Sequence, residues 1–238
     1  MKNAVVVTVL VFIINHNIYS QENRKIDATT NATHLITKNQ SGITEKVSVD
    51  PNSLDLSYLS IFLIHIGTYD QNGNASVMAT MASNIYNLNH PYLLLNLRQG
   101  AVTYKNIMNK KAFTLNLPSE EFLIQADYDG HASLGEIEQF DIEDITAEEA
   151  DSVNAPGVKE FPLYYECTFE KLINIEGKEL ILGQVKNVKI NRTCLTNGKM
   201  ELSKVKPILY NHQRARYFNV GNHIGDLRIS RDIYKQNP

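Results

Sequence analysis

Two long apolar runs, separated by the three residues "EGK", constrain the fold of this chain more than any other feature. The first run, "FPLYYECTFEKLINI", spans residues 161–175, and the second, "ELILGQVKNVKI", spans residues 179–190. Both are rich in the aromatic and β-branched residues that favour strands, and the connection is short enough for a tight turn. The second run alternates apolar and polar residues, which indicates a sheet with one face in contact with water. The chain is therefore predicted to contain an antiparallel hairpin of two long strands.

Shorter runs of the same kind precede this hairpin and indicate a more extensive sheet. Residues 59–70, "LSIFLIHIGTYD", form an apolar run that leads into "DQNGN", where Asn72 and Gly73 favour a tight hairpin turn. Further strands are predicted from the runs "ASVMATMASNIY", "YLLLNL" and "KAFTLNL". Strands that dominate a chain and follow one another closely are typical of a barrel with short helices packed outside it.

Two short helices are expected between the strands. The run "PSEEFLIQADYD" has Ser119 as an N-cap, with Glu120 and Glu121 in the favourable first turn. Thr146 and Glu149 have the spacing of a capping box and predict another short helix. A chain of 238 residues, 43% of them hydrophobic, can bury one sizeable core. We therefore predict a single, mainly β domain with extensions.

The amino terminus differs in composition from the rest of the chain. A short basic start precedes the apolar stretch "AVVVTVLVFII", and "NIYS" ends in a small residue at a plausible cleavage point. Residues 1–20 are thus typical of an export signal peptide, or of an N-terminal anchor through which the protein would touch a membrane. Residues 21–48 are polar and are interpreted as a tail or linker before a domain at residues 49–238. The expected location is the bacterial periplasm, or the cytoplasm if the start of the chain is misassigned.

Charge and cysteine content argue against several classes of function. A formal net charge of -3 gives no indication of nucleic-acid binding, and the chain has no zinc-binding motif or Walker loop. Cys167 lies in a strand-like run and is interpreted as a small buried apolar residue. If the protein is exported, Cys167 and Cys194 could form one disulfide bond. No metal site is expected.

The stretch "NLRQGAVTYKNI" places polar side chains where an apolar strand ends and a helix begins. Arg98 and Gln99 follow the strand, and Thr103, Tyr104 and Asn106 lie on the first turn of the helix. Free backbone N–H groups at a helix N-terminus favour an anion, and a guanidinium, a hydroxyl and an amide supply further donors. We interpret the stretch as a phosphate site. In the alternative, structural interpretation, Arg98 pairs with an acidic residue and Thr103 caps the helix.

Several motifs follow one another in order between residues 54 and 230: "GTYDQNGNASVMATMAS", "HPYLLLNLRQGAVTYKNIMNKKAFTLNLPSEE", "ADYDGHASLGEIEQF", "NAPGVKEFPLYYEC", "LGQV" and "VKPILY". This ordered set resembles the flavin reductase-like family of FMN-binding split barrels, and within it the flavoredoxin group. The resemblance implies a six-stranded Greek-key barrel, a homodimer, and FMN held near the dimer interface.

The resemblance also implies which residues hold FMN. One segment corresponds to the family segment whose backbone runs beside the isoalloxazine ring, a second to the phosphate and ribityl contacts, and a third to the strand that closes the pocket. The implied cofactor-binding residues are Ser76, Val77, Met78, Ala79, Thr80 and Met81 beside the ring, Arg98, Gln99, Thr103 and Asn106 at the phosphate and ribityl chain, and Phe113, Thr114 and Asn116 at the closing strand. No catalytic residue is implied.

Some positions depart from the family pattern. Family members often carry Asn where this chain has Ser76, Thr where it has Ala79, and an aromatic residue where it has Ala82. A lost hydroxyl or amide would alter the hydrogen bonds of the ring and its redox tuning. Thr80 is a candidate replacement, although adjacent strand residues face opposite ways. His131 lies in a stretch that resembles a loop over the active site. It is interpreted either as a substrate-side donor or as an exposed loop residue.

The function implied by the resemblance is that of an FMN-dependent oxidoreductase, in which the cofactor does the chemistry and the protein positions it. Electrons would pass from a reduced donor, either NAD(P)H or a redox protein, through FMN to a free flavin or a protein acceptor. Because an exported protein meets little NAD(P)H, the alternative is an exported FMN-binding electron carrier without NAD(P)H turnover. A further alternative keeps the barrel but binds another phosphorylated ligand, such as pyridoxal phosphate.

Overall fold

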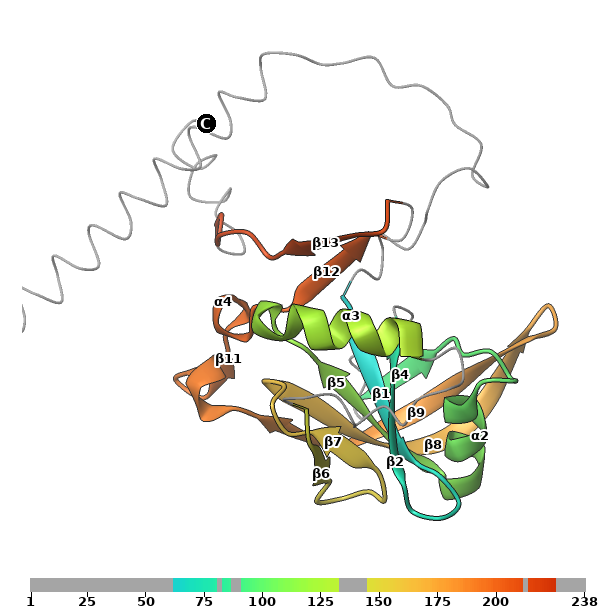
Figure 1. Cartoon of the computed structure of the whole chain (residues 1–238). Coiled ribbons are helices and arrows are strands. Elements are labelled where there is room, and N and C mark those ends of the chain that lie inside the picture. The colour runs from blue at the N-terminus through green and yellow to red at the C-terminus, as the bar shows by residue number, and fades with distance from the viewer. Residues whose placement is uncertain (1–61, 81–82, 87–90, 133–144, 212–213, 226–238) are drawn as a thin grey trace, which may run out of the picture. The chain divides into compact units, whose positions relative to one another are not determined.

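The structure is a computed structural model that describes residues 62–225 except for 81–82, 87–90, 133–144 and 212–213 (Figure 1). Residues Asp50–Gly221 form one compact unit, to which every element discussed below belongs. The predicted signal peptide and polar tail lie outside the described residues. No helix in the described part of the chain is long and apolar enough to span a membrane.

The largest sheet has seven strands in the order β2-β1-β5-β8-β9-β4-β3, and all neighbouring strands are antiparallel. Gly73, in the turn between the first two strands, has a φ of 89°, which explains the Asn-Gly signal in the sequence. The antiparallel, strand-rich fold expected from the sequence is therefore confirmed. The strands are β1 (Ile64–Tyr69), β2 (Ala75–Thr80), β3 (Ser83–Tyr86), β4 (Tyr92–Leu95), β5 (Ala112–Leu117), β8 (Leu163–Ile175) and β9 (Lys178–Ile190).

The two edge strands of this sheet are consecutive in sequence, which closes the sheet into a barrel. β2 lies at one edge, beside β1, and β3 lies at the other edge, beside β4. Residues 81–82 alone separate Thr80 from Ser83. The Cα atoms of Thr80 and Ser83 therefore lie within about 11 Å of each other, because consecutive Cα atoms are about 3.8 Å apart. If β2 and β3 are counted as one strand, the seven hydrogen-bonded strands give the six strands of the barrel that the resemblance implied.

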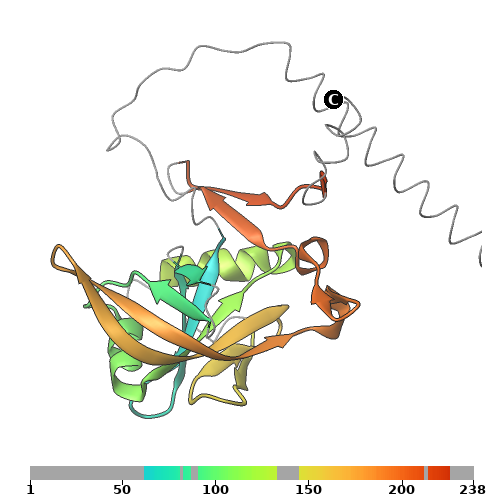
Figure 2. The ribbon, with the colours of Figure 1, turned by 180° about the vertical axis from the view of Figure 1, so that it is seen from behind.

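β8 and β9 form the long hairpin predicted from the sequence. Their ladder ends with Ile175 opposite Lys178. Glu176 and Gly177 form the turn with φ values of 50° and 83°, and two positive φ angles are typical of the tight turn that matches the twist of a hairpin. The tip of this hairpin projects beyond the rest of the barrel (Figures 1 and 2).

Apolar side chains from the barrel strands and from α2 (Val102–Lys110) form the main core. A Cβ atom at Gly183 on β9 would overlap the ring of Phe113, so glycine at this position leaves room for that ring in the core. Cys167 is buried in this core, as predicted. Cys194 is buried as well, and both cysteines are free, so they do not form the disulfide bond that the sequence left open. Among the core residues are Ile64, Ile66, Leu93, Leu95, Ile107, Phe113, Leu115, Leu163, Cys167 and Ile181.

Two of the helices lie where the sequence predicted helical structure. α2 packs against β1, and the helix η3 (Glu120–Phe122) continues into α3 (Leu123–Ala132), which packs against β2 (Figure 1). Ser119 occupies the N-cap position, but its side chain forms no capping hydrogen bond. His131 belongs to α3, so the expected loop at this position is wrong.

The short helix expected at Thr146–Glu149 is a strand instead. β6 (Ala147–Glu149) pairs with β7 (Pro156–Val158) in a separate two-stranded sheet. The backbone N–H of Thr146 donates to Oε2 of Glu160 at 2.8 Å. The capping-box spacing is a local signal, and here pairing with a more distant segment overrides it.

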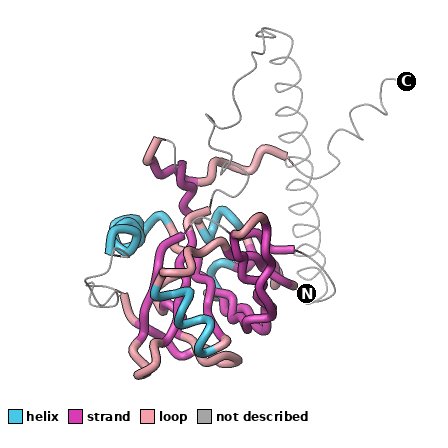
Figure 3. Tube along the Cα trace, turned by 90° about the vertical axis from the view of Figure 1, so that its right-hand side faces the viewer, coloured by secondary structure: helices cyan, strands magenta, loops and turns pink. Residues whose placement is uncertain are grey.

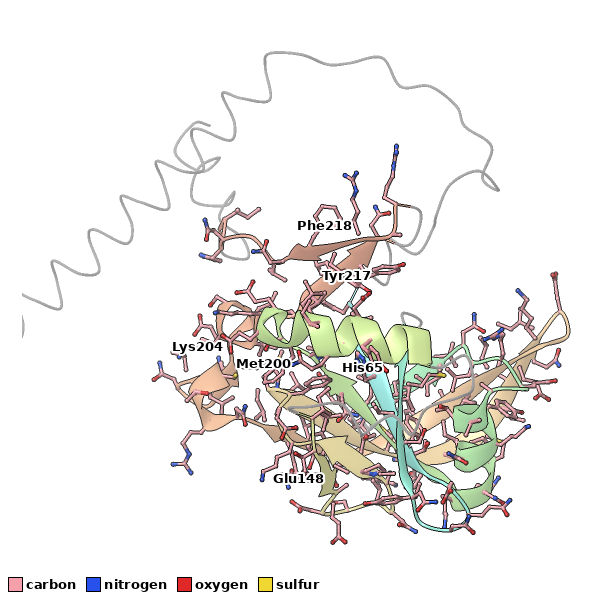
Figure 4. The ribbon with its side chains drawn as sticks, in the orientation of Figure 1. His65, Glu148, Met200, Lys204, Tyr217 and Phe218 are labelled. Carbon is pink, nitrogen blue, oxygen red and sulfur yellow. The ribbon has the colours of Figure 1, made fainter. Side chains whose placement is uncertain are left out.

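The C-terminal part of the unit adds small elements outside the barrel, which Figure 3 distinguishes by secondary structure. The hairpin of β12 (Ile208–Asn211) and β13 (Arg216–Asn219) is held by the N–H of Leu63, which donates to the carbonyl of Ile208 at 2.9 Å, and by the Tyr217 hydroxyl, which donates to Oδ1 of Asp127 on α3 at 2.6 Å (Figure 4). The other elements are η4 (Arg192–Cys194), β10 (Leu195–Thr196), β11 (Lys199–Met200) and α4 (Leu202–Val205).

Candidate functional site

The loop between β4 and α2 places the predicted phosphate-binding residues around the first turn of a helix. The N–H of Ala101 donates to the carbonyl of Arg98 at 2.9 Å and turns the chain into the helix. Ala101 is the N-cap residue, and no side chain of the described residues caps α2. The first turn also contains no acidic residue. Within the described part of the chain, the backbone N–H groups of this turn therefore have no side-chain cap, and such groups favour an anion.

Arg98 is an exposed cation at this helix end. Within the described part of the chain, its guanidinium forms no hydrogen bond or ion pair. Thr103 is buried inside α2, whereas the N-cap position belongs to Ala101. Both parts of the structural interpretation, an acid partner for Arg98 and a cap from Thr103, are thus missing among the described residues.

Gln99 and Tyr104 already hold an acidic side chain. Nε2 of Gln99 donates to Oε2 of Glu179 at 2.8 Å, and the Tyr104 hydroxyl donates to the same oxygen at 2.6 Å. The hydrogen bond to Glu179 raises the pKa of Tyr104, because it stabilises the protonated phenol. Glu179 comes from β9, close to the tip of the long hairpin. Glu179 carries no recognisable sequence signal, because no local pattern connects it to Gln99 and Tyr104, which precede it by 80 and 75 positions.

The inner face of α2 packs against the barrel. Thr103 and Asn106 are buried, and Nδ2 of Asn106 donates to Oγ1 of Thr68 on β1 at 3.1 Å. This hydrogen bond attaches the helix to the barrel and pairs two polar groups that would otherwise be costly to bury. The implied contact of both residues with the cofactor stays a prediction.

The strand expected to close the pocket has a fully paired polar network. Oγ1 of Thr114 donates to the carbonyl of Pro156 at 2.5 Å, and Nδ2 of Asn116 donates to Oγ1 of Thr114 at 2.8 Å. Oδ1 of Asn116 accepts from the N–H of Val158 at 2.8 Å. Both side chains are buried, as is Phe113 in the main core. These residues link β5 to β7, and their contact with a cofactor also stays a prediction.

β2, which corresponds to the segment beside the flavin ring, presents alternate residues to two sides. Met78 packs against the main core, whereas Val77 and Ala79 belong to smaller clusters on the other side. Because neighbouring residues alternate along a strand, Thr80 lies on the side of Met78. The Thr80 hydroxyl therefore lies on the opposite side of the strand from Ala79, and its contact with the ring stays a prediction. Ser76 also lies on the side of Met78, and Met81 and Ala82 lie outside the described residues.

His65 is a buried titratable residue that sequence reasoning did not single out. Its side chain is fully buried in β1, with Nε2 3.2 Å from the carbonyl oxygen of Ala126 and its ring edge-on to Phe161 (Figure 4). Burial lowers the pKa of His65 to about 4, because the charged imidazolium would lose its hydration. His65 is therefore neutral near pH 7.

A pocket of about 400 Å³ lies at the opposite end of α2 from Arg98. Its lining includes Tyr69, Lys110 and Asn154, and none of the predicted cofactor-binding residues. Burial, and then the charge of Glu149, raise the pKa of Tyr69. This pocket is distinct from the predicted phosphate site. No group of three or more His, Cys, Asp or Glu side chains that could hold a metal ion occurs in the described residues.

A cluster of charged side chains attaches β6 to the barrel. The Tyr164 hydroxyl donates to Oε1 of Glu148 at 2.7 Å, and Nζ of Lys189 lies 3.2 Å from both Glu148 and Asp151 (Figure 4). The hydrogen bond from Tyr164 lowers the pKa of Glu148. Each carboxylate has a donor within the cluster, so the arrangement is explained by the fold.

Comparison with known proteins identifies the family and structural relatives of this barrel. Residues 62–219 match the family described as flavin reductase like domain. The flavoredoxin of Desulfovibrio vulgaris (Miyazaki F) is 28% identical, with a match that covers 76% of this chain and 97% of that chain at a TM-score of 0.69. Flavoredoxin from Methanosarcina acetivorans is 21% identical, over 77% of this chain and 95% of its own, at a TM-score of 0.68.

A third solved structure shares the fold at lower identity. Nitrilotriacetate monooxygenase component B from Bacillus cereus is 20% identical, and the match covers 77% of this chain and 100% of that chain at a TM-score of 0.65. The family match itself extends over more than half of the 238 residues and includes every strand of the barrel. The chain belongs to the flavin reductase-like family.

Proposed function

We propose that this protein is an FMN-dependent oxidoreductase that passes electrons from a reduced donor through bound FMN to a flavin or protein acceptor. The observation that carries the proposal is the family match over residues 62–219. A flavin is the cofactor that this match supports. Among the described residues, no side chain caps the N-terminus of α2 and none pairs with the exposed guanidinium of Arg98 beside it, which supports a phosphorylated flavin in particular.

The hydrogen-bond donors around α2 fit a phosphate group, but one nearby acidic residue does not. Arg98 and the first-turn N–H groups would hold the phosphate, because a guanidinium and a helix N-terminus both favour a dianion. This acidic residue is Glu179, whose carboxylate already accepts the hydrogen bonds that Gln99 and Tyr104 could donate to a phosphate. Bound FMN would supply the redox chemistry through its isoalloxazine ring.

Binding and orientation are what the chain itself contributes in this proposal. His65 is neutral at pH 7 and fully buried, so it is not a proton donor to a ligand. The buried network of Thr114 and Asn116 fixes the position of β7 against β5. A rigid barrel wall of this kind orients a cofactor without supplying an acid or a base.

A second candidate function is an exported FMN-binding electron carrier without NAD(P)H turnover. The signal-like composition of residues 1–20 favours it. In the periplasm the electron donor would be a redox protein, and with a cytoplasmic location it would be NAD(P)H. We further propose a homodimer with the flavin near its interface, which gel filtration combined with light scattering would test.

The absorption spectrum of the purified protein tests the central proposal. We expect a yellow protein, or one that takes up FMN at one equivalent per protomer, because the barrel belongs to a flavin reductase-like family. NADH and NADPH consumption with free flavin then separates the reductase from the carrier. Folded protein that ignores FMN but takes up pyridoxal phosphate would replace the flavin with another phosphorylated ligand.

Replacement of Arg98 by Ala tests the position of the phosphate. Because a charge-assisted hydrogen bond to a dianion is lost, FMN affinity should fall by about 1.5–3 kcal/mol, or roughly tenfold to a hundredfold. Riboflavin lacks the phosphate and should lose far less affinity. Flavin fluorescence titrations measure both ligands, with a melting curve to verify folding. Lys105→Ala removes another exposed cation of α2 and is the matched control. Equal losses for FMN and riboflavin would mean that the phosphate lies elsewhere.

A further inference from the structure

Glu179 places a negative charge among the donors of the proposed phosphate site. Its Oε2 accepts from Nε2 of Gln99 at 2.8 Å and from the Tyr104 hydroxyl at 2.6 Å. Gln99 precedes α2 and Tyr104 lies on its first turn, so the carboxylate lies at the helix end that also carries Arg98. Two neutral donors of the site are therefore already used by an acidic group of the chain itself.

We propose that Glu179 is a specificity-determining residue that reduces the preference of this site for a phosphorylated flavin over riboflavin. The inference rests on the proposed function, since it concerns the same flavin site. A phosphate beside α2 meets Arg98, which attracts it, and the Glu179 carboxylate, which repels it. The phosphate must also compete with that carboxylate for Gln99 and Tyr104. Riboflavin carries no such charge, so Glu179 affects it much less.

The geometry explains why the carboxylate stays in place. Glu179 is the second residue of β9, and its Cα pairs with that of Asn174 across the hairpin. Its backbone is therefore held by the sheet, while its side chain contacts α2 through two hydrogen bonds. Arg98 has no ion pair in the described part of the chain, so its charge is not neutralised by Glu179.

The experiment compares FMN and riboflavin binding in three variants of the full chain by flavin fluorescence. Glu179→Gln keeps an oxygen that accepts from Gln99 and Tyr104 but removes the charge. We expect FMN affinity to rise about tenfold and riboflavin affinity to change less than twofold. Glu176→Gln removes the same charge from the exposed turn of the same hairpin, and should change the ratio of the two affinities less than twofold. Tyr104→Phe keeps the Glu179 charge and should not raise FMN affinity.

The results separate this inference from the proposed function. If the parent protein binds both flavins and Glu179→Gln leaves the ratio of their affinities unchanged, the specificity role of Glu179 is wrong while the flavin site stands. An equal rise for FMN and riboflavin would also overturn it, because the effect would then not concern the phosphate. If the folded parent binds neither flavin, the proposed function and this inference fail together. A melting curve for each variant verifies that the fold is intact.

Discussion

At the scale of single residues, His65 shows how burial controls a charge inside the barrel. The imidazole is fully buried and its pKa is lowered to about 4, whereas an unfolded chain has a histidine pKa of about 6.5. Between these two values the unfolded state binds more protons than the folded state. The free energy of unfolding therefore decreases as the pH falls through this window.

We predict that the protein loses about 2 kcal/mol of stability between pH 7 and pH 5 through His65 alone. Urea unfolding at several pH values measures the loss. His65→Gln cannot take up this proton, so its free energy of unfolding should vary less over the same range, whatever its absolute stability. The lowered pKa of Glu148 acts in the same direction but at lower pH, around its ordinary value of about 4 and below. A parent and variant with equal pH dependence would contradict the prediction.

At the scale of secondary-structure elements, strands were predictable where a hydrophobic pattern and a turn signal agreed. Asn72 and Gly73 marked the first hairpin, and the "EGK" connection marked the long one, because both require backbone angles that few residues adopt. The capping-box pattern at Thr146 wrongly predicted a helix, because such patterns are local and frequent. The N–H of Thr146 is paired with Glu160, a contact that depends on how the chain returns after β7.

Gly67 on β1 provides a prediction about the packing of these elements. A Cβ atom there would overlap the carbonyl oxygen of Pro156 and the hydroxyl of Thr114, and the backbone oxygen cannot move aside cheaply. Gly67→Ala should therefore lower the free energy of unfolding by about 1–3 kcal/mol, measured by chemical denaturation. Gly100→Ala is the matched control, because a methyl group at that position would have no atom within 4 Å. Equal stability of the two variants would mean that β7 packs less tightly on β1.

At the scale of the whole molecule, the barrel was predictable and the composition of its site was predictable only in part. The family resemblance of the ordered motifs indicated six strands, which is the number obtained when β2 and β3 are counted as one. Arg98 could be placed from the strand–helix boundary alone. Glu179 could not, because its contact with Tyr104 depends on the register of β9 and on the position of α2 against the sheet. Long-range packing therefore brings the negative charge of Glu179 to the site.

Residues outside the compact unit are not expected to contribute to flavin binding. Residues Asp50–Gly221 form one compact unit that contains the whole barrel, α2 and Glu179. A chain restricted to residues 50–221 should therefore unfold in a single cooperative transition, with a Tm within a few degrees of the full chain by circular dichroism. It should also bind FMN within threefold of the full-length affinity, because Arg98 and the first turn of α2 are retained. Cooperative unfolding with FMN affinity reduced tenfold or more would show that residues outside this unit complete the flavin site, while loss of the transition itself would show that they complete the fold.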